Sequence, residues 1–153
     1  MQIQILQVAD TKDSNIKALE KEYEKRLSSF SKLETLSVKA SKSDNREQAQ
    51  TEEEKLLTPK LNKDAAIIAL DENGKTLSST EFAEFIRKIR DEGQGKAQFI
   101  IGGSNGIHPN ILNAANYRLS FSKMTFTHEM IRVFLKEQLY RAFCILAGKR
   151  YHK

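Results

Sequence analysis

Three glycines and a histidine lie close together in the stretch IGGSNGIH, residues 101–108, directly after a short apolar run. Glycines at the end of a strand expose backbone N–H groups and let a ligand approach the main chain closely. The same stretch also suits a tight turn, in which Asn105 and Gly106 supply positive φ. It lacks the Gly-Lys-Ser/Thr end of a phosphate loop, and no glycine-rich turn follows the first strand. A cofactor here must therefore be held differently from a nucleotide in these motifs.

The chain contains three histidines, His108, His128 and His152, and a single cysteine, Cys144. Their spacing matches no metal-binding motif, so we expect no metal. A single cysteine forms no intrachain disulfide, which fits a reducing compartment. Neither a Ser-His-Asp set nor a pair of catalytic carboxylates can be assigned from spacing alone.

The closing residues GKRYHK place cations around an aromatic ring, with Arg150 next to Tyr151. Such a mixture suits a nucleic-acid base and its phosphates, and a solvated basic C-terminus is an equally good interpretation. The formal charge of +5 and the pI near 9.3 favour a polyanionic partner only weakly, because many proteins are mildly basic.

Strand-like and helix-like patterns alternate along the chain and must position these residues. Apolar runs and alternation predict strands at residues 3–8, 33–40, 65–71, 97–101 and 117–121. Helical spacing and start signals predict helices at residues 16–30, 46–57, 78–91, 109–115 and 127–146. ENGK, residues 72–75, should turn the chain. We expect one α/β domain over residues 1–153, with a mostly parallel sheet flanked by helices.

The helix predicted at residues 127–146 carries apolar side chains on more than one side. Thr127 is its candidate N-cap, and Glu137 and Arg141 form an i,i+4 pair. A helix of this kind is usually packed on more than one side. In a chain this short we expect a second subunit to supply the extra contact, and a central helix within a monomer is the alternative.

Nothing in the sequence predicts a membrane or a secreted protein. No apolar stretch approaches the roughly 18 residues that span a bilayer. The opening MQIQILQVAD lacks the basic and long apolar regions of a signal peptide. We therefore expect a cytoplasmic location and no membrane partner.

Three segments, IGGSNGIH, LSFSKMTFTHEMIRVFLKEQLYRAF and the closing YHK, resemble the SPOUT superfamily of methyltransferases. Within it they are most similar to enzymes that modify a pseudouridine of large-subunit ribosomal RNA, and the resemblance covers essentially the whole chain. Thr127 stands where many relatives have proline, and TEEEKLL lacks a glycine often seen there. Threonine caps a helix as well as proline starts one, so neither departure argues against activity.

The resemblance implies an α/β fold with a C-terminal trefoil knot, a homodimer, and S-adenosylmethionine (AdoMet) bound in the knot. The cofactor contacts that it implies are Leu70, Gly102, Phe121, Ser122, Lys123, Met124, Thr125 and Phe126. The implied reaction is transfer of the sulfonium methyl group to N3 of a pseudouridine in large-subunit ribosomal RNA, on the assembled ribosome.

Because N3 carries a proton that must leave, the implied reaction needs a base. His128 is the first candidate, followed by His152 and Glu137. Candidate RNA contacts are Arg132, Arg141, Arg150 and Tyr151, the last by stacking on the target base, although Arg141 could serve only its pair with Glu137. Two alternatives stay open: a SPOUT methyltransferase for another RNA such as transfer RNA, and a non-catalytic ribosome-binding protein with the same fold.

Overall fold

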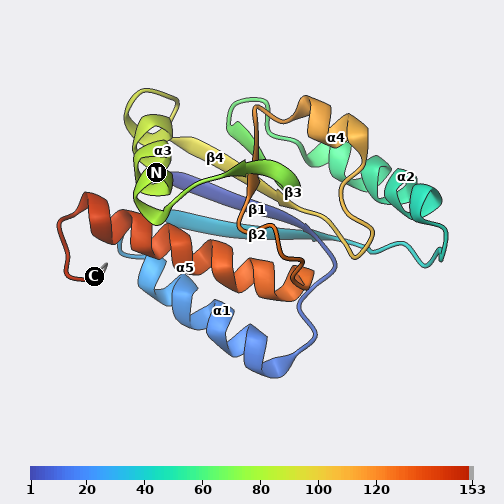
Figure 1. Cartoon of the computed structure of the whole chain (residues 1–153), viewed down its shortest axis with the longest axis horizontal. Coiled ribbons are helices and arrows are strands. Elements are labelled where there is room, and N and C mark those ends of the chain that lie inside the picture. The colour runs from blue at the N-terminus through green and yellow to red at the C-terminus, as the bar shows by residue number, and fades with distance from the viewer. Residues whose placement is uncertain (152–153) are drawn as a thin grey trace.

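A parallel sheet with the strand order β2-β1-β4-β3-β5 forms the centre of the computed structural model, which describes residues 1–151 (Figure 1). The strands are β1 (Gln2–Val8), β2 (Lys32–Val38), β3 (Ala66–Thr76), β4 (Lys96–Ile101) and β5 (Tyr117–Ser120). The helices are α1 (Ser14–Leu27), α2 (Arg46–Leu57), the short 3-10 helix η1 (Thr58–Lys60), α3 (Ser79–Asp91), α4 (Pro109–Ala114) and α5 (His128–Leu146). The predicted fold class, an α/β domain with a parallel sheet, is confirmed.

Helices cover both faces of the sheet, and the strands explain why. In β3, Ile68 packs into the core beneath α1, α3 and α5, whereas its neighbours Ile67 and Ala69 pack beneath α2 and α4. Successive side chains of a strand point to opposite faces. An uninterrupted apolar run is therefore the pattern of a strand that is buried on both sides.

Local start signals operate as the sequence predicts. Ser78 and Glu81 form a reciprocal capping box at the start of α3. The Thr127 hydroxyl accepts the Met130 N–H at 3.3 Å and caps α5. Helix α1 begins earlier than predicted because the Asp13 carboxylate caps it by accepting two N–H groups.

Helix α5 lies on one face of the sheet and packs against both α1 and α3 (Figure 1). These two neighbours account for its apolar side chains on more than one side. The breadth of the apolar surface therefore does not require a second subunit, because the alternative, a central helix within one chain, explains the same pattern. The homodimer implied by the family resemblance stays a prediction.

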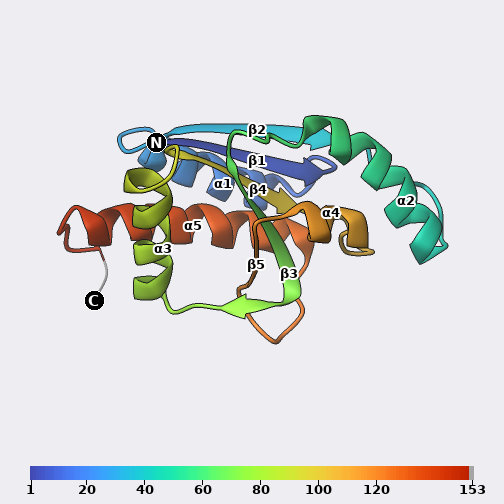
Figure 2. The same ribbon diagram turned by 90° about the horizontal axis from the view of Figure 1, so that it is seen from above.

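The segment ENGK does not end the third strand, contrary to our prediction. Strand β3 continues to Thr76, and its pairing with β5 shifts in register between Leu70 and Lys75. Figure 2 shows the two strands beside each other. At Gly74 a Cβ atom would lie only 2.6 Å from the carbonyl carbon of Leu119. The glycine therefore permits a close approach of two strands within an irregular pairing, instead of a reversal of the chain.

The trefoil knot also stays a prediction, because strand order and pairing do not determine how the chain threads. Within residues 1–151, no helix has the length and apolarity to cross a bilayer.

Replacing Gly74 with alanine should lower the free energy of unfolding by about 2 kcal/mol or more, because the new Cβ meets rigid backbone of β5. The neighbouring Asn73 is exposed, so Asn73→Ala is the matched control and should change stability by less than about 0.5 kcal/mol. Urea unfolding of both variants measures the difference. Equal stabilities would contradict the close approach of β3 and β5.

Candidate active site

Three segments that the family resemblance assigns to the cofactor leave the sheet at one edge. Leu70 in β3 pairs with Ile101 of β4 on one side and with Leu119 of β5 on the other. All these strands are parallel, so their carboxyl ends lie together. Gly102 directly follows β4, and Phe121 directly follows β5. In open parallel sheets, ligands bind at this carboxyl edge.

A cavity of about 130 Å³ lies between the ends of β3 and β5. Its lining includes Leu70, Asp71, Glu72, Leu119, Ser120, Phe121, Ser122, Met124, Thr125, Phe126 and Ile131. Six of the eight predicted cofactor residues are in this list, and Gly102 and Lys123 are not. Asp71 and Glu72 were not predicted, although they directly follow the apolar run of β3. They lie between the two registers of the β3–β5 pairing, outside the paired residues.

A second cavity, of about 490 Å³, extends over the start of α3 to Glu137 of α5. It shares with the first the lining residues Leu119, Ser120, Phe121, Ser122 and Phe126. Pockets for small molecules usually have volumes of about 300–1,000 Å³. The first cavity alone is too small, whereas the two adjoining cavities together have room for a cofactor-sized molecule.

The loop at residues 121–126 is shaped by serine hydroxyls. Ser120 donates from its hydroxyl to the Ser122 carbonyl at 2.8 Å, and the Ser122 hydroxyl accepts the Met124 N–H at 2.9 Å. Phe126 packs edge-on against Phe134 of α5, with ring centroids 5.2 Å apart. The Met124 side chain is 72% exposed. Two hydrogen bonds thus brace the loop, and its exposed side chains include the apolar Met124 and Phe126 beside the polar Lys123 and Thr125.

The glycine loop is a tight turn. Gly106 has φ +80° and donates its N–H to the Gly103 carbonyl at 3.1 Å. Asn105 is not among the residues with positive φ, so only half of the predicted pair adopts it. Gly102 is buried, and a Cβ there would lie 2.7 Å from the Ile107 side chain. Gln50 of α2 donates to the Asn105 carbonyl at 2.8 Å and supports the turn from outside.

His128 is the first residue of α5 and is partly buried. Burial lowers the pKa of its imidazole, and the nearby positive charges of Arg132 and Lys12 lower it further, while Glu129 opposes them. The imidazole is therefore neutral at neutral pH, which is the form that accepts a proton.

The other candidate bases differ from His128. The Glu137 carboxylate already accepts hydrogen bonds from Arg141 at 3.0 Å, Gln138 at 2.7 Å and the Tyr151 hydroxyl at 3.3 Å. These donors occupy most of the acceptor positions of the carboxylate, so few remain free to meet a proton of the substrate. His152 lies outside the described residues.

Arg132 is not placed as a phosphate contact, and that prediction is corrected. Its side chain is fully buried and donates to the carbonyls of Val8 and Ala9 at 2.7 and 2.9 Å. The sequence pattern missed this because a cation among apolar helix positions is usually taken for a surface group.

The other predicted RNA contacts lie near the C-terminus of the described chain. Arg141 pairs with Glu137, and its guanidinium carbon lies 4.9 Å from the centroid of the Tyr151 ring. Tyr151 also packs edge-on against Tyr140 at 4.7 Å, and burial raises the pKa of its phenol. Arg150 is exposed. The structure thus brings Glu137, Arg141 and Tyr151 together, with Arg150 beside them.

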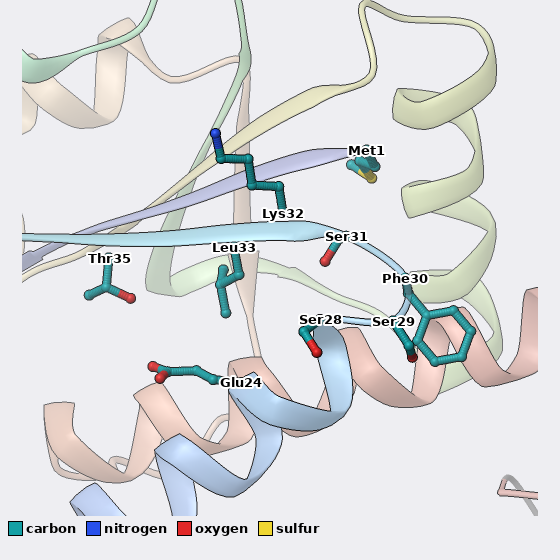
Figure 3. A pocket seen from close by; sticks show the side chains of 9 residues that line it. All are labelled: Met1, Glu24, Ser28, Ser29, Phe30, Ser31, Lys32, Leu33 and Thr35. Atoms are coloured by element: carbon teal, nitrogen blue, oxygen red, sulfur yellow. The ribbon is translucent and has the colours of Figure 1, made fainter.

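Two further findings limit the search for sites. Within residues 1–151, no group of three His, Cys, Asp or Glu side chains could hold a metal ion. An open hollow of about 790 Å³ lies between the end of α1 and the amino ends of β1 and β2, with Met1, Ser31 and Lys32 in its lining (Figure 3). It lies at the amino edge of the parallel sheet and contains no predicted site residue, so it is not the candidate active site.

A family model described as "Predicted SPOUT methyltransferase" matches residues 1–152. The chain therefore belongs to the SPOUT methyltransferase family, whose cofactor is AdoMet, and it is an AdoMet-dependent enzyme. It is 42% identical to proteins called Ribosomal RNA large subunit methyltransferase H from two strains of Clostridium botulinum, Kyoto / Type A2 and Okra / Type B1. Each comparison covers 100% of both proteins, over 159 residues.

Solved structures resemble the chain more distantly. A probable methylase family protein from Haemophilus influenzae Rd KW20 matches with a TM-score of 0.58 and 15% identity, over 99% of this chain and 70% of that one. The SpoU methyltransferase AviRb from Streptomyces viridochromogenes, in complex with AdoMet, has a TM-score of 0.48 and 13% identity, over 96% of this chain and 58% of that one. The Haemophilus protein shares the fold.

Gly102→Ala should weaken AdoMet binding about tenfold or more, because the added Cβ pushes the turn away from the carboxyl edge of the sheet. Ser104→Ala is the matched control, since this loop residue is exposed and should leave binding unchanged. Calorimetric titration with AdoMet measures both, and circular dichroism checks the fold. Unchanged affinity in a folded Gly102→Ala variant would remove Gly102 from the cofactor site.

Proposed function

We propose that this protein transfers a methyl group from AdoMet to N3 of a pseudouridine in large-subunit ribosomal RNA, within the assembled ribosome. The observation that carries the proposal is the full-length identity of 42% to proteins named Ribosomal RNA large subunit methyltransferase H. The cavities at the carboxyl edge of the sheet support it, because they lie where a parallel sheet binds its ligand.

The residues around the two cavities suit AdoMet chemically. Leu70, Phe121 and Phe126 offer apolar surface to an adenine ring, and the carboxylates of Asp71 and Glu72 offer acceptors to hydroxyl or amino groups. AdoMet supplies an electrophilic methyl group on a sulfonium. The protein's own contribution is to hold the nucleophile in line with that methyl group, which accounts for much of the rate gain in such displacements.

The proton on N3 must be removed, and we assign this step to His128. It is neutral at neutral pH because burial and nearby positive charge lower the pKa of its imidazole. Glu137 is engaged by three donors and ranks behind it. His152 remains a candidate from the family resemblance alone.

The RNA contacts that we propose are Arg150, Arg141 and Tyr151, with Lys123 exposed on the loop at the rim of the cavity. We also propose a homodimer in which one subunit holds the cofactor and the other helps to position the RNA. Exposed apolar groups support it, since Met124 is 72% and Phe126 39% exposed beside the cavity. A ribosomal substrate would place the protein in the cytoplasm.

Incubation with methyl-labelled AdoMet and ribosomes that lack the modification should label one pseudouridine of the large-subunit RNA. Mass mapping of nuclease fragments locates the methyl group. Transfer RNA and naked large-subunit RNA, offered in parallel, should be labelled far less. Labelling of transfer RNA alone would replace the proposed substrate, and binding of AdoMet without labelling of any of these RNAs would overturn the proposed reaction.

His128→Ala should lower turnover about a hundredfold, because general-base catalysis contributes roughly that much or more, while AdoMet affinity changes little. His128→Asn should lose as much, since its amide takes no proton at neutral pH. His108→Ala is the control, because His108 only caps α4, with its Nδ1 accepting the Asn110 N–H at 3.1 Å. Single-turnover rates and calorimetry separate the two effects. Normal turnover in His128→Ala would exclude His128 as the base.

A further inference from the structure

Helix α5 carries two cations that are removed from solvent: Arg132 is 0% and Lys136 1% exposed. Buried charges are stable only when they are paired and hydrogen-bonded. Lys136 bonds to the carboxylates of Glu20 and Glu24 on α1. Arg132 bonds instead to the β1–α1 loop, which we define as residues 9–13.

The contacts of Arg132 are concentrated around one unusual backbone position. The guanidinium donates to the carbonyls of Val8 and Ala9 and, at 2.8 Å, to the hydroxyl of Thr11. Ala9 has φ +61° and is the only non-glycine residue with positive φ among the described residues. L residues with a Cβ rarely adopt this conformation, so the surrounding structure must hold it. Arg132 therefore bonds both the carbonyl that precedes Ala9 and the carbonyl of Ala9 itself.

A second contact ties the same loop to α5. The Glu129 carboxylate accepts the Lys12 N–H at 2.7 Å. Glu129 and Arg132 are three residues apart and therefore share one side of the helix. His128 is the residue before Glu129, at the first position of the helix. The loop itself follows β1, whose Gln7 pairs with Ile101 immediately before the glycine loop.

We propose that Arg132 is a positioning residue for the methyl transfer: by bonding the carbonyls around Ala9 it fixes the β1–α1 loop against the first turn of α5, in which His128 is the first residue. This inference rests on the proposed function for its catalytic consequence. Its structural part, the hold of Arg132 on the loop and on His128, does not depend on which RNA is methylated.

The charges that face His128 come from two elements. Its own helix contributes Arg132 and Glu129, and the β1–α1 loop contributes Lys12. Asp10 of that loop acts on Arg132. Removing the guanidinium therefore withdraws a positive charge and loosens the loop, and both changes allow the pKa of the imidazole to rise towards its ordinary value.

Lys136 provides a matched comparison. It lies one turn further along α5, is equally buried, and bonds directly to Glu20 and Glu24 of α1. It reaches the loop only through Glu20, whose carboxylate also accepts the Thr11 hydroxyl. Its replacement should destabilise the protein in the same way as the loss of Arg132. Its replacement leaves the bonds of Arg132 to Val8 and Ala9 and the bond of Lys12 to Glu129 in place, so it should disturb the loop and His128 much less.

The experiment compares Arg132→Met with Lys136→Met in three measurements. NMR titration of His128 should give a pKa that rises by several tenths of a unit in Arg132→Met and changes much less in Lys136→Met. Hydrogen exchange of the Lys12 amide should speed up much more in Arg132→Met than in Lys136→Met. At the optimum pH, kcat should fall about tenfold or more in Arg132→Met, while the KM for AdoMet changes little. The acidic limb of the pH profile of kcat should move to higher pH.

Equal effects of the two variants on His128 and on Lys12 exchange would overturn the positioning role and leave only a structural one. Should Arg132→Met fail to fold, Arg132→Lys and Lys136→Arg replace the pair. Lysine keeps the charge but cannot bridge both carbonyls, so Lys12 exchange and kcat should change in Arg132→Lys alone. The NMR and exchange measurements need no RNA. A failure of the proposed reaction is therefore distinguished from a failure of Arg132 to hold the β1–α1 loop. The inference is refuted if the His128 pKa and the Lys12 exchange rate in Arg132→Met equal those of the unmodified protein. Where Arg132→Lys is used, an unchanged Lys12 exchange rate and an unchanged kcat refute it.

Discussion

The parallel pairing of β4, β3 and β5 is the constraint on which the candidate site depends. It sets Ile101, Leu70 and Leu119 side by side, so that three segments leave the sheet at one edge. The register shift after Leu70 leaves Asp71 and Glu72 outside the ladder, and both line the smaller cavity. Gly74 allows β3 to return to β5 after that interruption. The interruption in pairing therefore leaves two residues free to line the cavity, and β3 pairs with β5 again from Lys75 onward.

The regular part of this fold could be predicted from local patterns, because each strand and helix is consistent with its own sequence. The apolar runs at residues 65–71 and 97–101 need burial on both faces, and Ser78 and Thr127 mark helix starts by their capping chemistry. Gly74 misled us for a physical reason. A glycine between polar residues fits a turn as well as a close approach of two strands, and only the partner strand distinguishes them.

Helix α5 shows the same limit for side chains. Its periodicity correctly indicates that it is packed on several sides, yet periodicity does not say whether the neighbours belong to the same chain. In the structure α1 and α3 take those places. Nor does it separate a surface cation from a buried one: Arg132 and Arg141 look alike in sequence, while one is wholly enclosed and the other pairs with Glu137 near the surface. The cofactor residues came from resemblance, since no spacing rule identifies the loop at residues 121–126.

The two buried cations of α5 differ in what they satisfy, and that difference argues for a role beyond packing. Apolar replacements of buried ion pairs are often neutral or even stabilising, by about 1–4 kcal/mol, so a helix that only filled the space between α1 and α3 would need neither. Lys136 neutralises carboxylates that another sequence could omit. Arg132 satisfies main-chain carbonyls, which no substitution on the loop can remove. A branched group with several donors meets these carbonyls and Thr11 together, where a single ammonium cannot span them equally well. The several donors of Arg132 thus match the acceptors that Val8, Ala9 and Thr11 present. The same loop bonds through Lys12 to Glu129, the residue after His128.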